Sequence, residues 1–373
     1  MVTAPAKVGA HVSEVDTPAL LIDLDALGRN IRRMQDRAAG TKAHLRPHSK
    51  THKSTTIANM QIAAGAIGVC CQKVSEAEVM VDGGVGDVFI SNEVVGRIKI
   101  ERVAALARRA KVSICVDDPH NVQELAAAAA KFGSTIHVLV ELNVGGNRCG
   151  VESAEDLARL AAAISSSPPL RFAGIQAYHG AAQHLRNYED RRSAIEGAVR
   201  KVIEATSLLR RNGLECDIIA GAGTGTFEFE IASGIYNELQ VGSYVFMDAD
   251  YGRNNDRSGK PVSDFENALF ILTTVMSYPV AKRAVVDAGL KALSVDSGMP
   301  RVMGNDAVSY AAASDEHGRL EIMSNDSPFK LGDKIRLVPG HCDPTVNLHD
   351  WFVCIRNSHV EGLWPVSARG AVF

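Results

Sequence analysis

The stretch from Leu45 to Lys53 holds five arginine, histidine or lysine side chains, and Lys50 stands between His48 and His52. Neighbouring cationic groups lower the pKa of a lysine and make its amine nucleophilic, as a Schiff-base lysine requires. The pattern therefore makes Lys50 a candidate for covalent catalysis. A solvated basic turn is the alternative, because surface clusters of such residues are common.

A glycine-rich segment, residues 220–226, follows a predicted strand. Small residues such as Gly223 and Gly225 let backbone N–H groups approach an anion, and Thr224 adds a hydroxyl. Phosphate binds after a late strand in many TIM barrels. Ser243 and Tyr244, at the end of the next predicted strand, would supply further donors. A flexible glycine turn is the alternative.

Polar side chains follow two other predicted strands. His179 and His184 are candidates for proton transfer near neutral pH, although a structural histidine is the alternative. Strand alternation places Gln176 and Tyr178 on one face. Arg148 follows the other strand and would hydrogen-bond a phenolate oxygen or hold a carboxylate.

A ligand-type cluster, Gly340-His341-Cys342-Asp343-Pro344-Thr345, lies near the end of the chain. In an extended segment His341 and Asp343 point the same way and Cys342 points the opposite way. An imidazole with a carboxylate suits Mn²⁺ or Mg²⁺, with water in the open positions. Ligation by Cys342 would favour Zn²⁺ instead. A polar turn without a metal is the alternative.

The elements that must position these groups alternate between strand-like and helix-like segments. The predicted strands are His44–Pro47, Gly68–Gln72, Asp87–Ser91, Val112–Asp117, His137–Asn143, Phe172–His179, Asp217–Ala222 and Glu238–Phe246. The predicted helices are Leu24–Ala38 with Asp25 as N-cap, Thr55–Ala64, Val74–Asp82, Glu93–Arg109, Pro119–Phe132, Ala154–Ser165 and Asp190–Asn212. This order predicts an α/β fold with a (β/α)8 TIM barrel. A doubly wound sheet is the alternative, weakened by the missing G-x-G-x-x-G motif.

The pattern changes after about residue 260. Strand-like segments with few helices between them follow, at Asn267–Tyr278, Arg283–Ala288, Lys334–Pro339 and Asp350–Arg356. They predict a second, mainly antiparallel β domain. We assign residues 25–260 to the barrel, and residues 1–24 and 261–373 to the β domain that carries the candidate metal site.

The composition narrows the class of protein. The formal net charge of −3 over 373 residues argues against nucleic-acid or membrane-surface binding, which needs a basic footprint. No apolar run reaches the roughly 18 residues that span a bilayer, and no secretory signal is present. Seven cysteines without a metal-type C-x-x-C spacing favour a reducing cytoplasm.

Ordered segments along nearly the whole chain resemble the fold-type III pyridoxal-phosphate enzymes, which join an alanine-racemase-like barrel to a β domain of the D-serine dehydratase kind. The chain looks most like the metal-dependent D-threonine aldolases and D-3-hydroxyaspartate aldolases. The segments that carry the resemblance are Arg46–Lys50, Gly68–Ala77, Ser91–Val94, Gly146–Val151, Gln176–Gly180, Gly223–Gly225, Gly242–Tyr244, Val286–Lys291 and Gly340–Thr345.

The resemblance implies a role for each candidate residue. Lys50 would carry pyridoxal 5′-phosphate as a Schiff base, and His184 would be the base near the substrate hydroxyl. His341 and Asp343 would bind a divalent metal, Mn²⁺ or Mg²⁺. The remaining cofactor contacts would come from Gln72, Arg148 and Tyr178 around the ring and from Gly223, Thr224, Gly225, Ser243 and Tyr244 at the phosphate. By analogy alone we also expect a homodimer.

One departure separates subfamilies. D-serine dehydratases carry a cysteine two positions after the histidine and bind zinc, whereas this chain has Asp343 there, as the aldolases do. The aldolase prediction is cleavage of D-3-hydroxyaspartate to glycine and glyoxylate, or of D-threonine to glycine and acetaldehyde. Arg253 and Arg301 are candidates for a substrate carboxylate. A dehydratase acting by β-elimination, a racemase and a non-enzymatic cofactor carrier are the alternatives.

Overall fold

The computed structural model describes residues 3–323 and 329–373. An eight-stranded parallel sheet has the order β2-β9-β8-β7-β6-β5-β4-β3. Its strands are β2 (His44–Leu45), β3 (Val69–Cys71), β4 (Asp87–Glu93), β5 (Lys111–Val116), β6 (Ile136–Glu141), β7 (Leu170–Gln176), β8 (Ile218–Gly221) and β9 (Glu238–Leu239). The sheet closes where Cys70 N donates to Pro47 O at 2.8 Å and His48 pairs with Cys70. The (β/α)8 barrel prediction is therefore confirmed.

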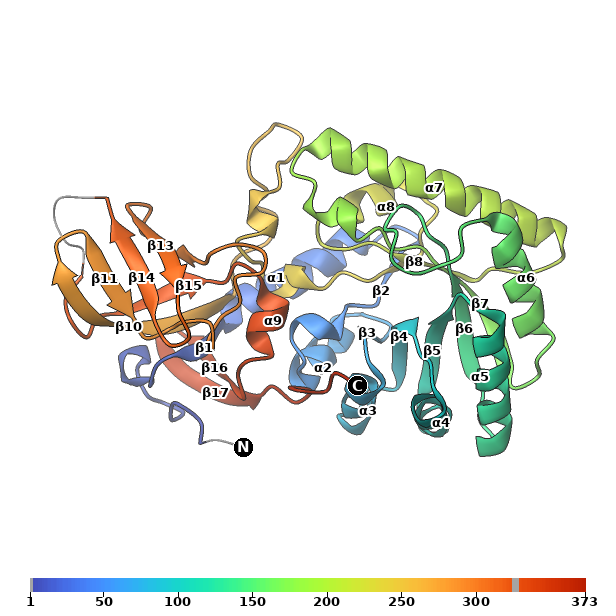
Figure 1. Cartoon of the computed structure of the whole chain (residues 1–373), viewed down its shortest axis with the longest axis horizontal. Helices are drawn as coiled ribbons and strands as arrows, with labels where there is room; N and C mark the ends of the chain where they lie inside the picture. Colours follow the sequence, from blue (N-terminus) through green and yellow to red (C-terminus); the bar gives the residue numbers. More distant parts are fainter. Residues whose placement is uncertain (1–2, 324–328) are drawn as a thin grey trace.

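Helices surround the barrel (Figure 1). They are α1 (Leu24–Ala38), α2 (Thr55–Ala63), α3 (Val74–Asp82), α4 (Arg97–Leu106), α5 (Pro119–Phe132), α6 (Ala154–Ser165), α7 (Tyr188–Arg211) and α8 (Phe227–Ser233). Four predicted helices, α1, α3, α5 and α6, have the bounds expected from sequence. The N-cap prediction for α1 was wrong, because Asp23 and not Asp25 accepts the free N–H groups of the first turn. The predicted strand over Glu238–Phe246 ends at Leu239, and a 3₁₀ turn over Ser243–Val245 follows.

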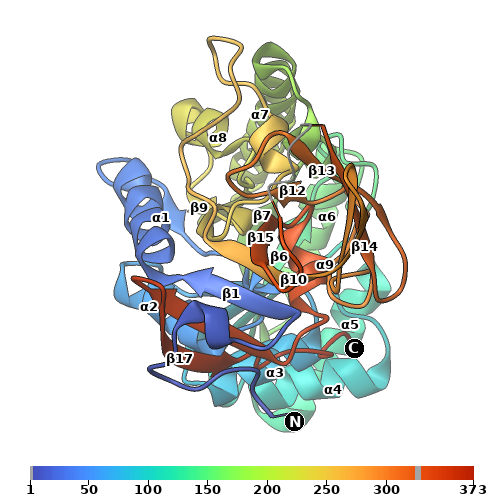
Figure 2. The ribbon, with the colours of Figure 1, turned by 90° about the vertical axis from the view of Figure 1, so that its left-hand side faces the viewer.

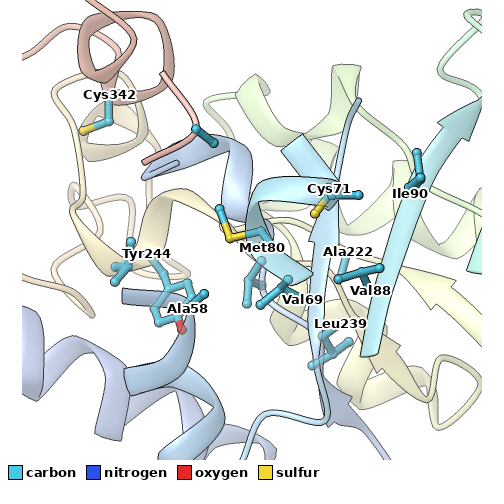
Figure 3. Close-up of a cluster of buried hydrophobic side chains, with 14 of the residues drawn as sticks. Ala58, Val69, Cys71, Met80, Val88, Ile90, Ala222, Leu239, Tyr244 and Cys342 are labelled. Carbon is cyan, nitrogen blue, oxygen red and sulfur yellow. The ribbon is translucent and has the colours of Figure 1, made fainter. Parts of the chain in front are cut away.

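The inside of the barrel follows from strand alternation. Cys70, Phe89, Cys115, Leu139, Ala173 and Ala220 form one buried cluster, drawn from six strands. The opposite faces of these strands pack against the helices in the largest core cluster. Figure 3 shows part of that core, in which Val69 of β3 pairs with Val88 of β4.

Arg46 forms two buried ion pairs with acidic residues that begin strands of the barrel. The Arg46 side chain is 1% exposed, and its Nε donates to Glu238 at 2.7 Å while its Nη1 donates to Asp87 at 2.6 Å. Asp87 and Glu238 begin β4 and β9. Although Arg46 is only four residues before Lys50 in the sequence, its ion pairs therefore lie at the end of the barrel opposite to the strand C-termini.

The second domain is a nine-stranded sheet in the order β11-β14-β13-β12-β15-β10-β1-β16-β17, and β10 also pairs with β11. Figure 2 views the molecule from the side of this domain, with β1 and β17 in front. The bounds are β1 (Ala19–Asp23), β10 (Leu269–Val280), β11 (Arg283–Val286), β12 (Arg301–Val302), β13 (Val308–Ala313), β14 (Gly318–Ile322), β15 (Lys334–Val338), β16 (Trp351–Arg356) and β17 (His359–Pro365). All pairs but β1–β16 are antiparallel, as predicted.

Strand β1 precedes the barrel in the chain yet pairs with β10 and β16 of the second sheet. The exact limits of the two domains stay a prediction. Residues 1–2 and 324–328, which we assigned to the β domain, lie outside the described residues. Over the described residues, none of the helices combines the length and apolar character that a membrane crossing requires. All seven cysteines are free thiols.

Candidate active site

A cavity of about 100 Å³ opens where the barrel strands end. Its walls come from loops that follow most of the strands, as the topology of a parallel barrel requires. The lining residues are His48, Lys50, Thr51, Gln72, Ser91, Arg148, Gln176, Tyr178, Gly223, Thr224, Gln240, Gly242, Ser243 and Tyr251. Seven of the predicted site residues are among them: Lys50, Gln72, Arg148, Tyr178, Gly223, Thr224 and Ser243.

Lys50 lies in a 3₁₀ turn, Ser49–Thr51, directly after β2. The buried Ser49 hydroxyl donates to Glu76 at 2.7 Å and lies 2.8 Å from Cys70 O. The other oxygen of Glu76 accepts from Gln72 N at 3.0 Å. One buried carboxylate thus holds the Lys50 turn and the Gln72 loop together, which fixes the lysine at the cavity.

The Lys50 ammonium forms an ion pair with Asp343 of the second domain. Burial lowers the pKa of Lys50, but the Asp343 carboxylate and Tyr178 outweigh burial, so its pKa is raised. The prediction of a depressed lysine pKa was therefore wrong in this structure. The prediction assumed that the two neighbouring histidines are cations. Burial instead lowers the pKa of His52 to about 4 and the pKa of His48 well below its usual value. Neither ring is therefore charged at neutral pH.

A cradle of backbone donors faces the same cavity. In the described part of the chain, the N–H groups of Gly223, Thr224, Gly242 and Ser243 have no hydrogen-bond partner, and all four residues line the cavity. A side chain at Gly223 would overlap the Gln183 amide, and one at Gly242 would come within 2.6 Å of Thr51 Oγ1. Such a set of convergent N–H groups fits a phosphate.

Two residues predicted to bind phosphate lie elsewhere. Gly225 does not line the cavity, and its N–H donates to Gln183 Oε1 at 3.0 Å. Tyr244 is buried; its N–H donates to Thr224 Oγ1, and its hydroxyl accepts from Gln61 at 3.0 Å. Gly225 and Tyr244 therefore pack beside the residues of the N–H cradle and do not themselves line the cavity.

Arg148, Tyr178 and Gln72 form the other walls. The Arg148 guanidinium lies 5.9 Å from the centre of the Tyr178 ring, a cation–π contact. Arg148 also lies 3.9 Å from Glu141, whose pKa burial and the neighbouring Glu93 raise to about 8. The buried Gln72 Oε1 has no hydrogen-bond partner among the described residues. These groups can hydrogen-bond the edge of a flat aromatic ligand.

His184 ends a 3₁₀ turn, Ala181–His184, that follows β7. Its Nδ1 donates to Asp250 at 2.6 Å, and its ring lies 5.3 Å from the ring of Tyr251, which lines the cavity. His184 itself is not among the lining residues. The hydrogen bond from Nδ1 leaves Nε2 as the basic nitrogen.

His341 is the N-cap of α9 (Cys342–Val346) and has the predicted extended backbone, whereas Asp343 lies in the first helical turn, so the segment is not extended throughout. The Cys342 thiol is nevertheless buried and lies near Met247 O. One Asp343 oxygen binds Lys50, and the other is buried and has no hydrogen-bond partner among the described residues. Burial raises the pKa of Asp343, but Lys50 and His341 outweigh burial and lower it to about 2.

The donor set near α9 fits a divalent cation held by few protein ligands. Asp343 Oδ1 is an anionic oxygen without a partner, and the neighbouring His341 offers Nε2, because its Nδ1 lies 2.8 Å from Asp296. Among the described residues, no three His, Cys, Asp or Glu side chains come close enough together to hold a metal. Two protein ligands with water in the other positions suit Mg²⁺ or Mn²⁺ better than zinc.

The sequence analysis missed Thr51, Ser91, Gln240 and Tyr251 as lining residues. Gln240 exchanges two amide hydrogen bonds with Gln176, at 2.9 and 2.8 Å. Period-two alternation at strand ends would have pointed to Ser91, which shares a strand face with Phe89 of the interior cluster.

Arg253 and Arg301, predicted candidates for a substrate carboxylate, do not line this cavity. Both line a second cavity of about 380 Å³ beside Gly340 and Ser297. Arg253 binds Asp250, and Arg301 donates to Asn267 at 3.1 Å. Among the described residues, Arg148 and Lys50 are therefore the arginine and the lysine that line the cavity at the barrel strand ends.

Comparison with known proteins places this geometry in context. Residues 22–250 match the alanine racemase N-terminal domain, and residues 268–355 match a putative serine dehydratase domain. The chain is 52% identical to the 3-hydroxy-D-aspartate aldolase of Paracoccus denitrificans, over 98% of this chain and 95% of that protein. The crystal structure of D-threonine aldolase from Filomicrobium marinum superposes with a TM-score of 0.97 at 50% identity, covering 99% of this chain and 100% of that one. D-threo-3-hydroxyaspartate dehydratase of Delftia is 29% identical over 89% of this chain and 92% of that protein.

Proposed function

Because this chain belongs to the alanine racemase-like family that includes 3-hydroxy-D-aspartate aldolase and D-threonine aldolase, we propose that it cleaves D-3-hydroxy amino acids to glycine and an aldehyde. The observation that carries this proposal is the contact of Lys50, at the barrel cavity, with Asp343 from the second domain. It brings the lysine proposed for covalent catalysis and a candidate metal ligand into contact.

Pyridoxal phosphate fits the barrel side of the site. The N–H groups of Gly223, Thr224, Gly242 and Ser243 would hold its phosphate, and Lys50 would bind it covalently. Arg148, Tyr178 and Gln72 would surround its ring. When bound, the cofactor withdraws electrons from the substrate Cα, so that a bond to Cα can break.

A divalent cation fits the α9 side. His341 and Asp343 would hold it, and it would supply Lewis acidity to the β-hydroxyl of the substrate. His184 is the proposed base, because its Nδ1 bond to Asp250 leaves Nε2 to accept the hydroxyl proton. The Cα–Cβ bond then breaks, the former hydroxyl carbon leaves as an aldehyde, and Cα takes up a proton to give glycine.

We propose D-3-hydroxyaspartate as the first substrate, with D-threonine as the second. The 52%-identical relative supports the former, and the structural relative supports the latter. β-Elimination by a dehydratase is less well supported, because Asp343 stands where those enzymes are expected to carry a cysteine and the dehydratase relative is only 29% identical.

The proposal includes three finer features. The metal is Mn²⁺ or Mg²⁺, for which an oxygen and an imidazole are suitable ligands. The seven free thiols favour a reducing compartment, the cytoplasm. The active unit is a homodimer, by analogy with fold-type III enzymes.

The test is to incubate the purified protein with pyridoxal phosphate, Mn²⁺ and D-3-hydroxyaspartate and to identify the products. We expect glycine and glyoxylate in equal amounts. Ammonia and oxaloacetate would instead establish β-elimination and contradict the proposal.

A further inference from the structure

An aspartate without an assigned role lies against the imidazole of His341. Asp296 Oδ2 is 2.8 Å from His341 Nδ1, and Ser294 donates its hydroxyl to Asp296 Oδ1 at 2.7 Å. Next to a carboxylate, Nδ1 carries the ring proton, so the lone pair of His341 is on Nε2. The carboxylate thereby selects the tautomer and restrains the rotation of the ring.

The loop that carries Asp296 is fastened to α9 at two points. A Cβ atom on Gly340 would overlap the carbonyl oxygen of Gly298, so the two backbones touch. Ser294 N donates to Thr345 Oγ1 at 3.1 Å, and that hydroxyl donates to His341 O at 2.7 Å. The position of Asp296 relative to His341 is therefore determined by backbone packing and not by two free side chains.

The same loop is tied to the barrel. Arg253 donates to Ser297 O at 2.7 Å and also binds Asp250, the carboxylate that accepts from His184. Each of the two candidate histidines thus has its Nδ1 against an aspartate, and Arg253 connects the Asp250 carboxylate to the backbone of the residue after Asp296. The proposed reaction assigns no role to the Asp296 carboxylate beside His341.

We propose that Asp296 is a positioning residue for metal binding: it holds His341 in the orientation and tautomer that present Nε2 to the cation. A histidine ligand whose other nitrogen donates to a carboxylate is fixed in orientation and more basic, and losing such a partner weakens metal affinity by about 10–100-fold. The inference rests on the proposed function, because it assumes that His341 binds a divalent metal.

The experiment measures Mn²⁺ affinity of the full-length, cofactor-loaded protein by the electron paramagnetic resonance signal of free Mn²⁺. Wild type is compared with Asp296→Ala, Asp296→Asn and His341→Ala. Glu124→Gln is the matched control, because Glu124 also faces a histidine, His120, in an exposed pair at 3.8 Å. The visible absorbance of the bound cofactor reports that each variant is folded and loaded.

We expect the Mn²⁺ dissociation constant to rise about 10–100-fold in Asp296→Ala. We expect a smaller rise in Asp296→Asn, whose amide oxygen still accepts from Nδ1, and none in Glu124→Gln. Wild-type affinity in Asp296→Ala with weakened affinity in His341→Ala would overturn this inference and leave the proposed function standing. An Asp296→Ala loss larger than that of His341→Ala would make Asp296 a direct ligand. Absence of Mn²⁺ binding by the wild type would overturn both.

Discussion

The two sides of the candidate site, the barrel loops that line the cavity and the α9 segment with His341 and Asp343, are built in different ways. The barrel side collects one or two groups from the ends of many strands, and much of its chemistry comes from backbone N–H groups. The α9 side is a single short segment, and His341 and Asp343 supply its chemistry. Under the proposed function, the barrel would bind the cofactor, and one turn of the second domain would act on the substrate.

The largest effect should come from removing the group at which the two sides meet. Lys50→Ala removes the amine that is proposed to bind the cofactor covalently, so we expect no detectable cleavage and loss of the visible absorbance of the lysine-bound cofactor. Absorbance and product assays on the same sample measure both losses. Retained turnover would show that the barrel side does not depend on Lys50.

A second large effect concerns the stability of the barrel side alone. Arg46→Ala leaves the buried Glu238 carboxylate without its cation, whereas Asp87 keeps its ion pair with Lys111 at 3.2 Å. We therefore expect the free energy of unfolding to fall by about 3–5 kcal/mol, mainly because of Glu238. The comparison variant is Arg29→Ala, whose solvent-exposed pair with Glu266 should contribute far less to stability. Urea denaturation measures both. Equal losses would mean that burial of the Arg46 pairs is unimportant.

Asp343→Asn tests the proposed metal ligand and also weakens its ion pair with Lys50. It weakens the anionic oxygen offered to the metal, so we expect metal-stimulated cleavage to fall about 10²-fold or more, the equivalent of about 3 kcal/mol. The cofactor absorbance should be unchanged. Cys342→Ala is the control, since that buried thiol lies against Met247. A chelator should reproduce the Asp343→Asn defect in wild type; chelator-resistant cleavage would contradict the metal role.

The smallest effect concerns the phosphate cradle. In Gly242→Ala the new methyl group would lie 2.6 Å from Thr51 Oγ1, and relieving that contact costs about 1–3 kcal/mol. We expect pyridoxal phosphate to bind about 10-fold more weakly, with an unchanged Mn²⁺ affinity. Gly86→Ala, where a Cβ meets no atom within 4 Å, is the control. Equilibrium titration of the apoenzyme gives both constants.

Regular elements with a strong pattern were predictable from the sequence. The apolar periodicity of α1, α3, α5 and α6 led to correct bounds, because each helix buries one face against the barrel. Elements with little local signal were missed: α8, α9 and the strands β12, β13, β14 and β17. Most of these elements are short, or their apolar and polar residues alternate on a partly exposed sheet. Their formation therefore depends more on pairing with other strands than on local residue preference.

The amino-acid sequence by itself determined the two-domain plan and half of the residues that line the cavity, through periodicity, position at the ends of strands and the family resemblance. Only the tertiary structure decided the charge state of the site. Lys50 and Asp343 are far apart in the chain, and their ion pair raises the lysine pKa that local neighbours alone were expected to lower. Likewise, folding places Asp296 beside His341 and turns Gly225 and Tyr244 away from the cavity. Coulombic and hydrogen-bond energies depend on distances in space, which a linear pattern does not contain.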